Sequence, residues 1–294
     1  MNSLLNRILI RMPKIYALPW KSEKNWCTKD FMKALKLDTG QTLLEDPELI
    51  IFDKDGTLID VHFYWTAMIR MRTELLVQKY FKDTSDSQRS TRLIEAMGID
   101  ESTGKMKREG PVGIKPRSFI VQVVIQTLKE MGAAASVQEI ETLFREVDEK
   151  TLSHIRDFVR LLPGVENFVR KAHDAGILLS IATSDRTNRA QETLNQFGLS
   201  PYFHSVLGGD QIQNSKPEPE AVERLLVKTK ARREKTAVIG DHPVDILMGE
   251  NAGLICNIGV LTGLGTREDF KDLPCHIIES FNQLKVENEH ALHA

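Results

Sequence analysis

The chain has 294 residues, of which 41% are hydrophobic and 27% are charged, and its formal net charge is −2. This composition is typical of a globular protein, and the length suffices for one large domain or two modest ones. The balanced charge gives no reason to expect a nucleic-acid partner, and no apolar run is long enough to span a bilayer. The three cysteines form neither a zinc pattern nor a disulfide framework, which fits a reducing compartment best.

Residues 1–45 are predicted to form an extension ahead of the folded core. No acidic residue precedes Glu23, whereas apolar side chains there alternate with four cations: Arg7, Arg11, Lys14 and Lys21. This basic, amphipathic start resembles a mitochondrial targeting segment, and the simpler alternative is an untargeted, partly helical extension of a cytosolic enzyme. We expect a cytoplasmic protein, with a mitochondrial location as the alternative.

Residues 48–53 form a short apolar run that ends in polar residues and Gly56, which predicts a buried strand feeding a loop. From residue 61 to residue 160 the apolar residues recur at helical spacing instead. Helices are predicted at residues 63–80, 87–97, 117–131 and 137–152, with a glycine- and proline-rich loop between the second and the third. No strand is expected in this block.

Beyond Pro163 and Gly164, short strands alternate with short helices. Strands are predicted at residues 177–182, 205–208, 236–240 and 255–258, with a further candidate at 276–278, and helices at 188–197, 218–228 and 244–251. This alternation predicts an α/β fold, a Rossmann-like, doubly wound parallel sheet with helices on both faces. The predicted core comprises residues 46–60 and 161–294, and residues 61–160 form a helical insertion.

Groups of polar residues lie at four places near the ends of predicted strands: residues 53–57 (DKDGT), 183–185 (TSD), 215–217 (SKP) and 240–245 (GDHPVD). In open parallel sheets ligands bind outside the carboxyl ends of the strands, so these groups are expected to converge. Four of the side chains are acids that would repel each other strongly without a cation: Asp53, Asp55, Asp241 and Asp245. Oxygen ligation of this kind suits Mg²⁺.

Such a site is suited to phosphoryl transfer. A carboxylate can attack phosphorus and form an aspartyl-phosphate, and a second one can protonate the leaving alcohol and then deprotonate water. Gly56 lets the backbone approach a phosphoryl group closely. Thr183, the Ser184 amide and Lys216 supply donors and a positive charge where the transferred group is negative.

The segments DKDGTLID, IATSD, SKPEPE and GDHPVDILMGENAG together resemble the four motifs of the haloacid dehalogenase superfamily. The resemblance implies that Asp53 is the nucleophile and that Asp55 is the acid/base, which also binds metal through its backbone carbonyl. It further implies that Asp241 and Asp245 complete a Mg²⁺ site. The predicted phosphate-binding residues are Gly56, Thr57, Thr183, Ser184 and Lys216. The helical insertion corresponds to the family's mobile cap.

Some of these residues have simpler interpretations. Asp245 has the position and the chemistry to cap the helix that follows it. Lys115 and Arg117 lie in the loop of the predicted cap and are candidate substrate contacts, although surface cations are usually only solvated. Two residues depart from the usual motifs, Lys54 between the two first acids and His242 where serine or threonine is more common, and the sequence assigns no role to either.

The predicted function is that of a Mg²⁺-dependent phosphatase for a small phosphorylated metabolite. In layout the chain most resembles phosphoglycolate phosphatase, which implies a phosphoglycolate-like monoester. A 2-haloacid dehalogenase is an alternative, but that branch normally lacks an acid at the position of Asp55. A phosphomutase of the β-phosphoglucomutase type would keep both acids. A non-catalytic binding protein on the same fold is disfavoured because every expected acid is present.

Overall fold

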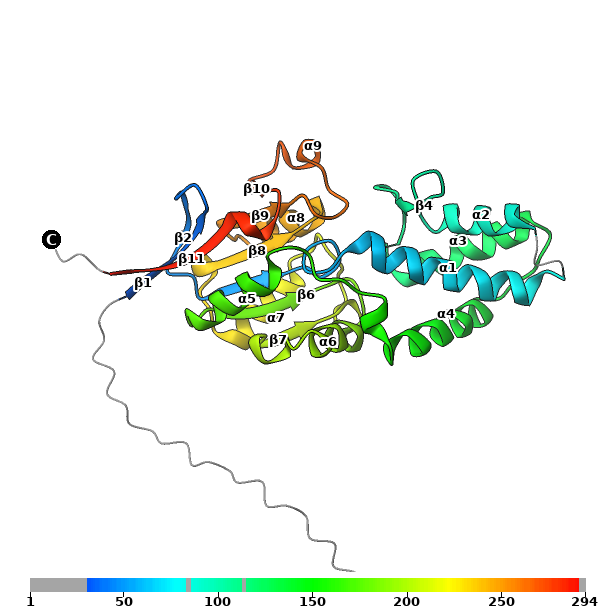
Figure 1. Ribbon diagram of the computed structural model, residues 1–294, viewed down its shortest axis with the longest axis horizontal. Helices are drawn as coiled ribbons and strands as arrows, with labels where there is room; N and C mark the ends of the chain where they lie inside the picture. The colour runs from blue at the N-terminus through cyan, green and yellow to red at the C-terminus, as the bar shows by residue number, and fades with distance from the viewer. Residues whose placement is uncertain (1–30, 83–85, 113–114, 291–294) are drawn as a thin grey trace, which may run out of the picture.

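The computed structural model describes residues 31–82, 86–112 and 115–290. These residues form two bodies, an α/β core and a helical body at one end of it (Figure 1). The predicted targeting segment lies outside the described residues. Within the described part of the chain, no helix is long and apolar enough to cross a membrane.

The core is built on a six-stranded sheet with the order β10-β9-β8-β3-β6-β7, in which every pair of neighbours is parallel. Its strands are β3 (Leu49–Phe52), β6 (Leu178–Ala182), β7 (Ser205–Leu207), β8 (Thr236–Gly240), β9 (Cys256–Val260) and β10 (His276–Ile278). Phe52 pairs with Ile181 on one side and with Ile239 on the other, so the segments that follow these three strands start at one edge. The predicted Rossmann-like parallel sheet is confirmed.

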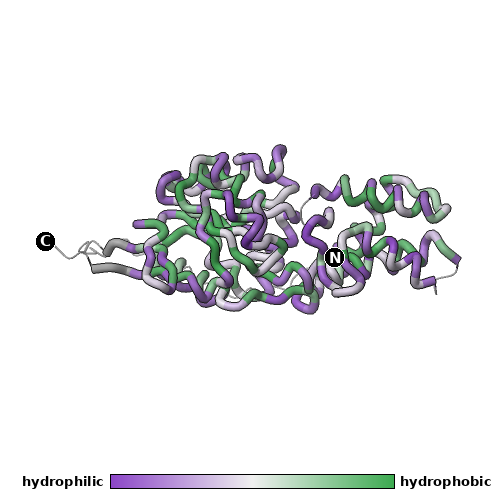
Figure 2. The backbone as a smooth tube through the Cα atoms, turned by 90° about the horizontal axis from the view of Figure 1, so that it is seen from above, coloured by the Kyte–Doolittle hydropathy of each residue, from purple (hydrophilic) through white to green (hydrophobic). Residues whose placement is uncertain are grey.

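Helices cover both faces of this sheet (Figure 1): α5 (Val165–Asp174), α6 (Thr187–Gln196), α7 (Glu220–Thr229) and α8 (Pro243–Asn251). Leu49 and Ile51 of β3 pack in one hydrophobic cluster with α7 and α8, whereas Ile50 and Phe52 pack in the other with α5. Burial on both faces explains why β3 is apolar throughout. In Figure 2 the most hydrophobic stretches of the core accordingly run through its interior.

Short segments complete the two bodies. They are α9 (Arg267–Phe270) and the 3₁₀ turns η1 (Ile155–Asp157), η2 (Ser200–Tyr202), η3 (Gly209–Gln211), η4 (Arg233–Lys235) and η5 (Phe281–Gln283).

A second, antiparallel sheet joins the two ends of the described chain, with the order β11-β1-β2. β1 (Phe31–Leu37) pairs with β11 (Leu284–His290) along its whole length and with β2 (Thr42–Glu45) on its other edge. Leu35 and Leu44 of this sheet are buried in the same cluster as α5. Residues 31–45, expected as part of an extension, therefore pack on the core. Their apolar residues form no run long enough to predict a strand.

The helical body consists of α1 (Val61–Tyr80), α2 (Ser87–Ala96), α3 (Arg117–Glu130) and α4 (Val137–Leu152), close to the predicted ranges. Asp60 caps α1 by accepting a hydrogen bond from the Phe63 amide at 3.0 Å. The body also contains two paired strands that were not expected, β4 (Ile99–Asp100) and β5 (Lys105–Met106). Strands of two residues show no periodicity from which to predict them.

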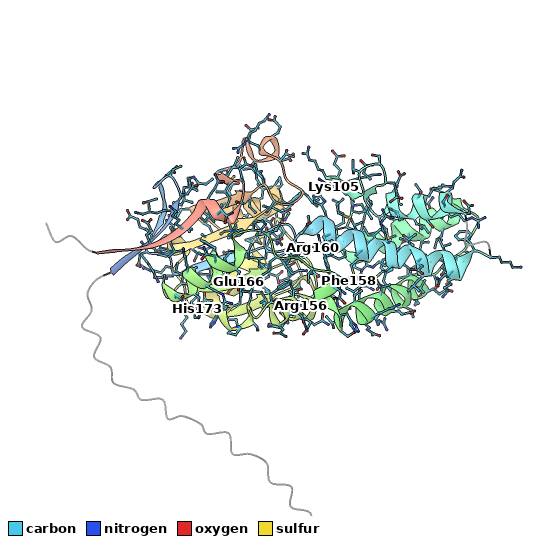
Figure 3. The ribbon with its side chains drawn as sticks, viewed as in Figure 1. Lys105, Arg156, Phe158, Arg160, Glu166 and His173 are labelled. Atoms are coloured by element: carbon cyan, nitrogen blue, oxygen red, sulfur yellow. The ribbon has the colours of Figure 1, made fainter. Side chains whose placement is uncertain are left out.

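The chain passes between the two bodies twice, and the two connecting segments lie side by side. The Asp60 amide donates to the Arg160 carbonyl at 2.9 Å, and the Leu162 amide donates to the Leu58 carbonyl at 3.0 Å. The Arg160 guanidinium lies over the Phe63 ring, 3.7 Å from its centroid, and Figure 3 shows Arg160 at this junction. Because α1 follows closely on the loop after β3, the junction places the helical body at the carboxyl edge of the sheet.

Candidate active site

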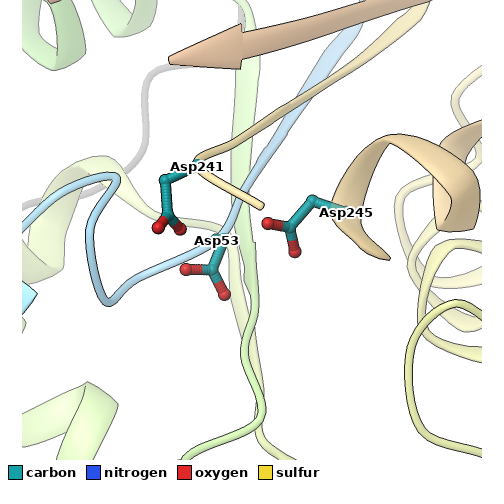
Figure 4. A group of neighbouring side chains, drawn as sticks. All are labelled: Asp53, Asp241 and Asp245. Atoms are coloured by element: carbon teal, nitrogen blue, oxygen red, sulfur yellow. The ribbon is translucent and has the colours of Figure 1, made fainter. Parts of the chain in front are cut away.

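Three carboxylates face one another at the carboxyl edge of the parallel sheet (Figure 4). Asp53 follows β3, Asp241 follows β8, and Asp245 lies in the first turn of α8. Oxygen atoms of the three lie within 4.8 Å of one another, and all three residues are buried. The Asp53 amide donates to the Ile239 carbonyl at 2.9 Å, which continues the pairing of β3 with β8 and brings the first two acids together.

Without a metal ion, the three buried carboxylates of this cluster repel one another. Burial raises the pKa of Asp241 well above its usual range, and the neighbouring charges of Asp53 and Asp245 raise it further. Burial also raises the pKa of Asp53, although Lys216 partly offsets this. Buried carboxylate oxygens are the ligands of a hard divalent cation, so these residues fit a metal site.

Asp241 is held by donors from two neighbouring loops. Its Oδ2 accepts a hydrogen bond from the Leu264 amide at 2.8 Å, and its Oδ1 accepts one from the Thr57 hydroxyl at 3.5 Å. Gly56 has a φ of +86°, and a Cβ there or at Gly263 would collide with the Asp241 carboxylate. Gly56 and Thr57 thus pack against a candidate metal ligand, and their contact with phosphate remains a prediction.

Lys216 bridges two of the acids. Its Nζ lies 2.6 Å from Asp53 Oδ1 and 2.7 Å from Asp245 Oδ1. Burial alone would lower the pKa of Lys216, but the two carboxylates outweigh burial and raise it above its usual value. The lysine therefore stays charged beside Asp53, where it can offset negative charge on a bound phosphoryl group.

Asp245 and His242 together begin α8. Asp245 Oδ2 accepts a hydrogen bond from the His242 amide at 3.1 Å and so caps the helix, while its Oδ1 faces Lys216. His242 Nδ1 accepts from the Val244 amide at 3.3 Å. Burial lowers the pKa of His242, which favours the neutral ring that this acceptor role requires. The histidine thus replaces the usual serine or threonine as the N-cap residue.

Lys54 links Asp55 to a second buried acid. Its Nζ lies 2.8 Å from Asp55 Oδ1 and 2.8 Å from Asp185 Oδ2, and it lies over the Tyr64 ring, 4.7 Å from the centroid. Burial raises the pKa of Asp55 to about 6, with the charges of Asp185 and Asp53 also raising it and Lys54 opposing them. A pKa near neutrality suits a group that donates and then accepts a proton.

One small cleft of about 30 Å³ lies among the acids at this edge of the sheet. Its walls include seven of the predicted site residues: Asp53, Asp55, Thr183, Ser184, Lys216, Asp241 and Asp245. Thr183 is positioned at the end of β6, where its hydroxyl accepts a hydrogen bond from the Asp185 amide at 3.1 Å. The fold thus brings residues from all four motifs to one place, and their catalytic roles remain predictions.

A second cavity, of about 80 Å³, adjoins the cleft and shares Asp55 and Ser184 with it. Lys115 and Arg117, the candidate substrate contacts, line this cavity, and their role remains a prediction. Several other polar lining residues are not predictable from the motifs: Arg72, Asp148, Arg186 and Arg189. The one signal for Arg72 is that a charged residue occupies the buried face of α1.

The family model for haloacid dehalogenase-like hydrolases matches residues 47–253, which include all of these motif residues. The chain belongs to this family. The superfamily resemblance drawn from the four motifs is therefore confirmed.

Relatives of this haloacid dehalogenase-like hydrolase are named as phosphatases and pyrophosphatases. A probable phosphatase IndB of Dickeya dadantii is 28% identical over 250 residues, which are 83% of this chain and 94% of the relative. A phosphoglycolate phosphatase of Vibrio cholerae is 36% identical over 114 residues, 38% of this chain and 48% of the relative. Pyrophosphatase PpaX of Listeria innocua is 27% identical over 203 residues, 69% of this chain and 78% of the relative.

Solved structures share the fold. A predicted phosphoglycolate phosphatase from Haemophilus somnus 129pt aligns with a TM-score of 0.61 at 19% sequence identity, covering 80% of this chain and 94% of that one. At this identity the likeness concerns the fold alone.

Proposed function

We propose that this hydrolase is a Mg²⁺-dependent phosphatase that cleaves a small phosphomonoester through an aspartyl-phosphate. One observation carries the proposal. The buried Asp53 lies 2.6 Å from the Lys216 ammonium and within one carboxylate cluster with Asp241 and Asp245, in a cleft that Asp55 also lines. The family and the phosphatase names of its relatives support the same reaction class.

The residues divide the reaction between them. Asp53, Asp241 and Asp245 would hold the Mg²⁺ ion, which when bound offsets the negative charge of the phosphoryl group. Asp53 attacks phosphorus, and Asp55 donates a proton to the departing oxygen. Asp55, now a carboxylate, takes a proton from the water that attacks the aspartyl-phosphate, which releases phosphate and restores Asp53. Lys216 stabilises the negative charge that develops during both steps.

We infer that the substrate is small and phosphoglycolate-like. The cleft of about 30 Å³ and the adjoining cavity of about 80 Å³ accommodate a phosphoryl group and a leaving group of few atoms, and a wider cavity of about 500 Å³ lies beyond Arg117, Ser184 and Arg186. The presence of Asp55, with its pKa of about 6, supports a reaction in which a leaving oxygen needs a proton. Dehalogenation has no such need.

The proposal is tested by measuring phosphate release from p-nitrophenyl phosphate and from a panel of phosphorylated metabolites. We expect the wild-type protein to be active with Mg²⁺ and inactive with a chelator, and we expect Asp53→Asn to lose all measurable turnover because its amide is not a nucleophile. Asp272→Asn, which changes an exposed aspartate outside the site, is the matched control and should keep full activity. Mg²⁺-dependent turnover by Asp53→Asn would contradict the proposal.

A further inference from the structure

The cavity of about 80 Å³ beside the catalytic cleft is built by both bodies of the molecule. Trp65 and Arg72 come from α1 and Asp148 comes from α4, whereas Arg186 and Arg189 come from the start of α6 and from α6 itself. Because the cavity shares two residues with the cleft, a leaving group attached to a phosphoryl group in the cleft would extend into it.

The lining of this cavity has an excess of positive charge. Five cationic side chains face three carboxylates, which leaves an excess of two: Arg72, Lys115, Arg117, Arg186 and Arg189 against Asp55, Asp148 and Asp185. Behind the lining, Lys54 lies 2.8 Å from two of these acids and Glu141 lies 2.7 Å from Arg117, so these two charges cancel and the excess stays at two. The field in the cavity therefore favours an anionic group over a neutral one of the same shape.

One acid holds three of the cations in place. Asp148 Oδ1 lies 3.1 Å from Arg72 Nη2 and 3.2 Å from Arg189 Nη1, and Asp148 Oδ2 pairs with Arg117 Nη1. Arg117 Nε also lies 2.7 Å from Glu141, and Arg189 Nε lies 3.7 Å from Asp185, so three carboxylates match these three guanidinium groups. The cluster is thus preorganised, and the excess positive charge of the lining comes from the exposed Lys115 and Arg186.

Two buried donors at the cavity have no acceptor within the described part of the chain, Arg72 Nε and Trp65 Nε1. The two residues are only 5% and 9% exposed, and Arg72 Cζ lies 5.5 Å from the Trp65 ring centroid. Both groups can only donate, and a buried donor without a partner is costly and rare. A bound ligand that carries a hydrogen-bond acceptor would satisfy these two donors.

We propose that the cavity binds an anionic group at the far end of the leaving group, a carboxylate or a second phosphate, and that Arg72 and Trp65 determine this specificity. The inference rests on the proposed phosphatase function and narrows its substrate to a phosphomonoester of a small acid or a small bisphosphate. The volume of the cavity, about 80 Å³, fits such a group. One water needs about 10–15 Å³, so the cavity holds a group of a few non-hydrogen atoms.

Matched substrate pairs test the inference on the Mg²⁺-loaded protein. Phosphoglycolate and its neutral amide differ in the charge of the far group, and 1,2-ethanediol bisphosphate and 2-hydroxyethyl phosphate form the equivalent pair for phosphate. We expect the anionic member of at least one pair to have the higher kcat/KM, by about 10- to 100-fold, as expected for one or two charge-assisted hydrogen bonds. The pair with the larger ratio of anionic to neutral kcat/KM shows whether the cavity prefers a carboxylate or a phosphate.

Variants assign this ratio to the proposed residues. Arg72→Met should lower the anionic-to-neutral ratio by about tenfold or more. Trp65→Phe, which keeps an aromatic ring but loses the five-membered ring with its N–H donor, should lower it less. Arg72→Lys keeps the charge and should retain part of the preference. Arg156→Met, which changes an exposed arginine near the junction (Figure 3), should leave the ratio unchanged. If Arg72→Met does not fold, Arg72→Lys and Trp65→Phe decide the question.

Binding measurements separate this inference from the proposed function. Asp53→Asn keeps an oxygen ligand in its amide, so it is titrated at a Mg²⁺ concentration shown to saturate it. Calorimetric titration with each pair then measures recognition without turnover, and a preference for the anionic member supports the inference even where turnover is absent. Wild-type protein that cleaves aryl phosphate but treats both members of each pair alike overturns the inference and leaves the function standing. An equal loss for both members in Arg72→Met would indicate a purely structural arginine and would also overturn it.

Discussion

Asp53 and Asp55 stand two positions apart but have different neighbours. Asp53 faces Lys216 and the two acids of the fourth motif, so its oxygens belong to the candidate metal cluster. Asp55 pairs with Lys54, which it shares with Asp185, and its pKa of about 6 lies close to neutrality. The surroundings therefore suit Asp53 to nucleophilic attack and Asp55 to proton transfer.

This division of roles predicts how Asp55→Asn depends on the leaving group. An asparagine cannot protonate the departing oxygen, so substrates with poor alkoxide leaving groups, such as phosphoglycolate, should lose about 10²- to 10⁴-fold in kcat. p-Nitrophenyl phosphate needs little protonation and should lose much less in aspartyl-phosphate formation, which pre-steady-state release of nitrophenol measures. Equal losses in that step for both substrates would show that Asp55 is not the general acid.

Lys54 shows why a motif residue can have no role assignable from sequence. Its second partner, Asp185, is 131 positions away and becomes a neighbour only when β3 and β6 pair in register. Arg72 and Asp148 likewise come together only when α1 packs on α4. The acids of the motifs could be predicted because their types and spacing carry the signal, whereas these ion pairs depend on tertiary contacts.

At the scale of elements, the central strands were predictable for a physical reason. β3 is a continuous apolar run, β8 is apolar apart from Thr236, and both are buried on both faces and followed directly by polar motif residues. The β11-β1-β2 sheet was not predicted, since its strands are partly exposed and pair the two ends of the described chain. The pairing of β1 with β11 joins residues about 250 positions apart, and no local pattern indicates such a partner.

The packing of β1 gives a direct test of whether residues 31–45 belong to the folded core. Leu35 is fully buried, so Leu35→Ala should lower the free energy of unfolding by about 2–5 kcal/mol, as measured by urea denaturation. Thr39→Ala, in the exposed turn between β1 and β2, is the control and should change it by less than about 0.5 kcal/mol. A dispensable extension would instead show no effect for either variant.

At the scale of the whole molecule, the site lies where two bodies meet. The sheet edge supplies the acids and Lys216, while both bodies line the adjoining cavity, with α1, α3 and α4 supplying part of its wall. An ion pair between Arg108 of the helical body and Asp269 of the core, at 2.5 Å, also joins the two bodies. The motif residues all lie in the core, whereas Trp65 and Arg72, which we propose to set the specificity, lie in α1. The motifs therefore predict the reaction type and carry no information on these two residues.

The buried acids also make the stability of the whole protein depend on pH and on Mg²⁺. In the metal-free fold, the pKa values of Asp53, Asp55 and Asp241 are raised, that of Asp55 to about 6, whereas an aspartate in the unfolded chain titrates near pH 4. The folded state therefore binds more protons than the unfolded state between about pH 4 and pH 6. This contribution to the free energy of unfolding falls as the pH rises through that window.

Mg²⁺ competes with protons for the same oxygens, so its stabilising effect should grow as the pH rises. We expect Mg²⁺ to raise the Tm more at pH 7.5 than at pH 5, with a gain of about 2.7 kcal/mol at 100 times its Kd. Asp241→Asn removes one buried charge, so it should raise the Tm of the metal-free protein at pH 7.5 and abolish most of the response to Mg²⁺. Comparing the thermal unfolding of this variant with that of the wild type separates the effect of the carboxylate cluster on stability from the effect of acids whose pKa is lowered, such as Glu48. A Mg²⁺ response that is equal at both pH values, or unchanged in Asp241→Asn, would place the metal away from these carboxylates.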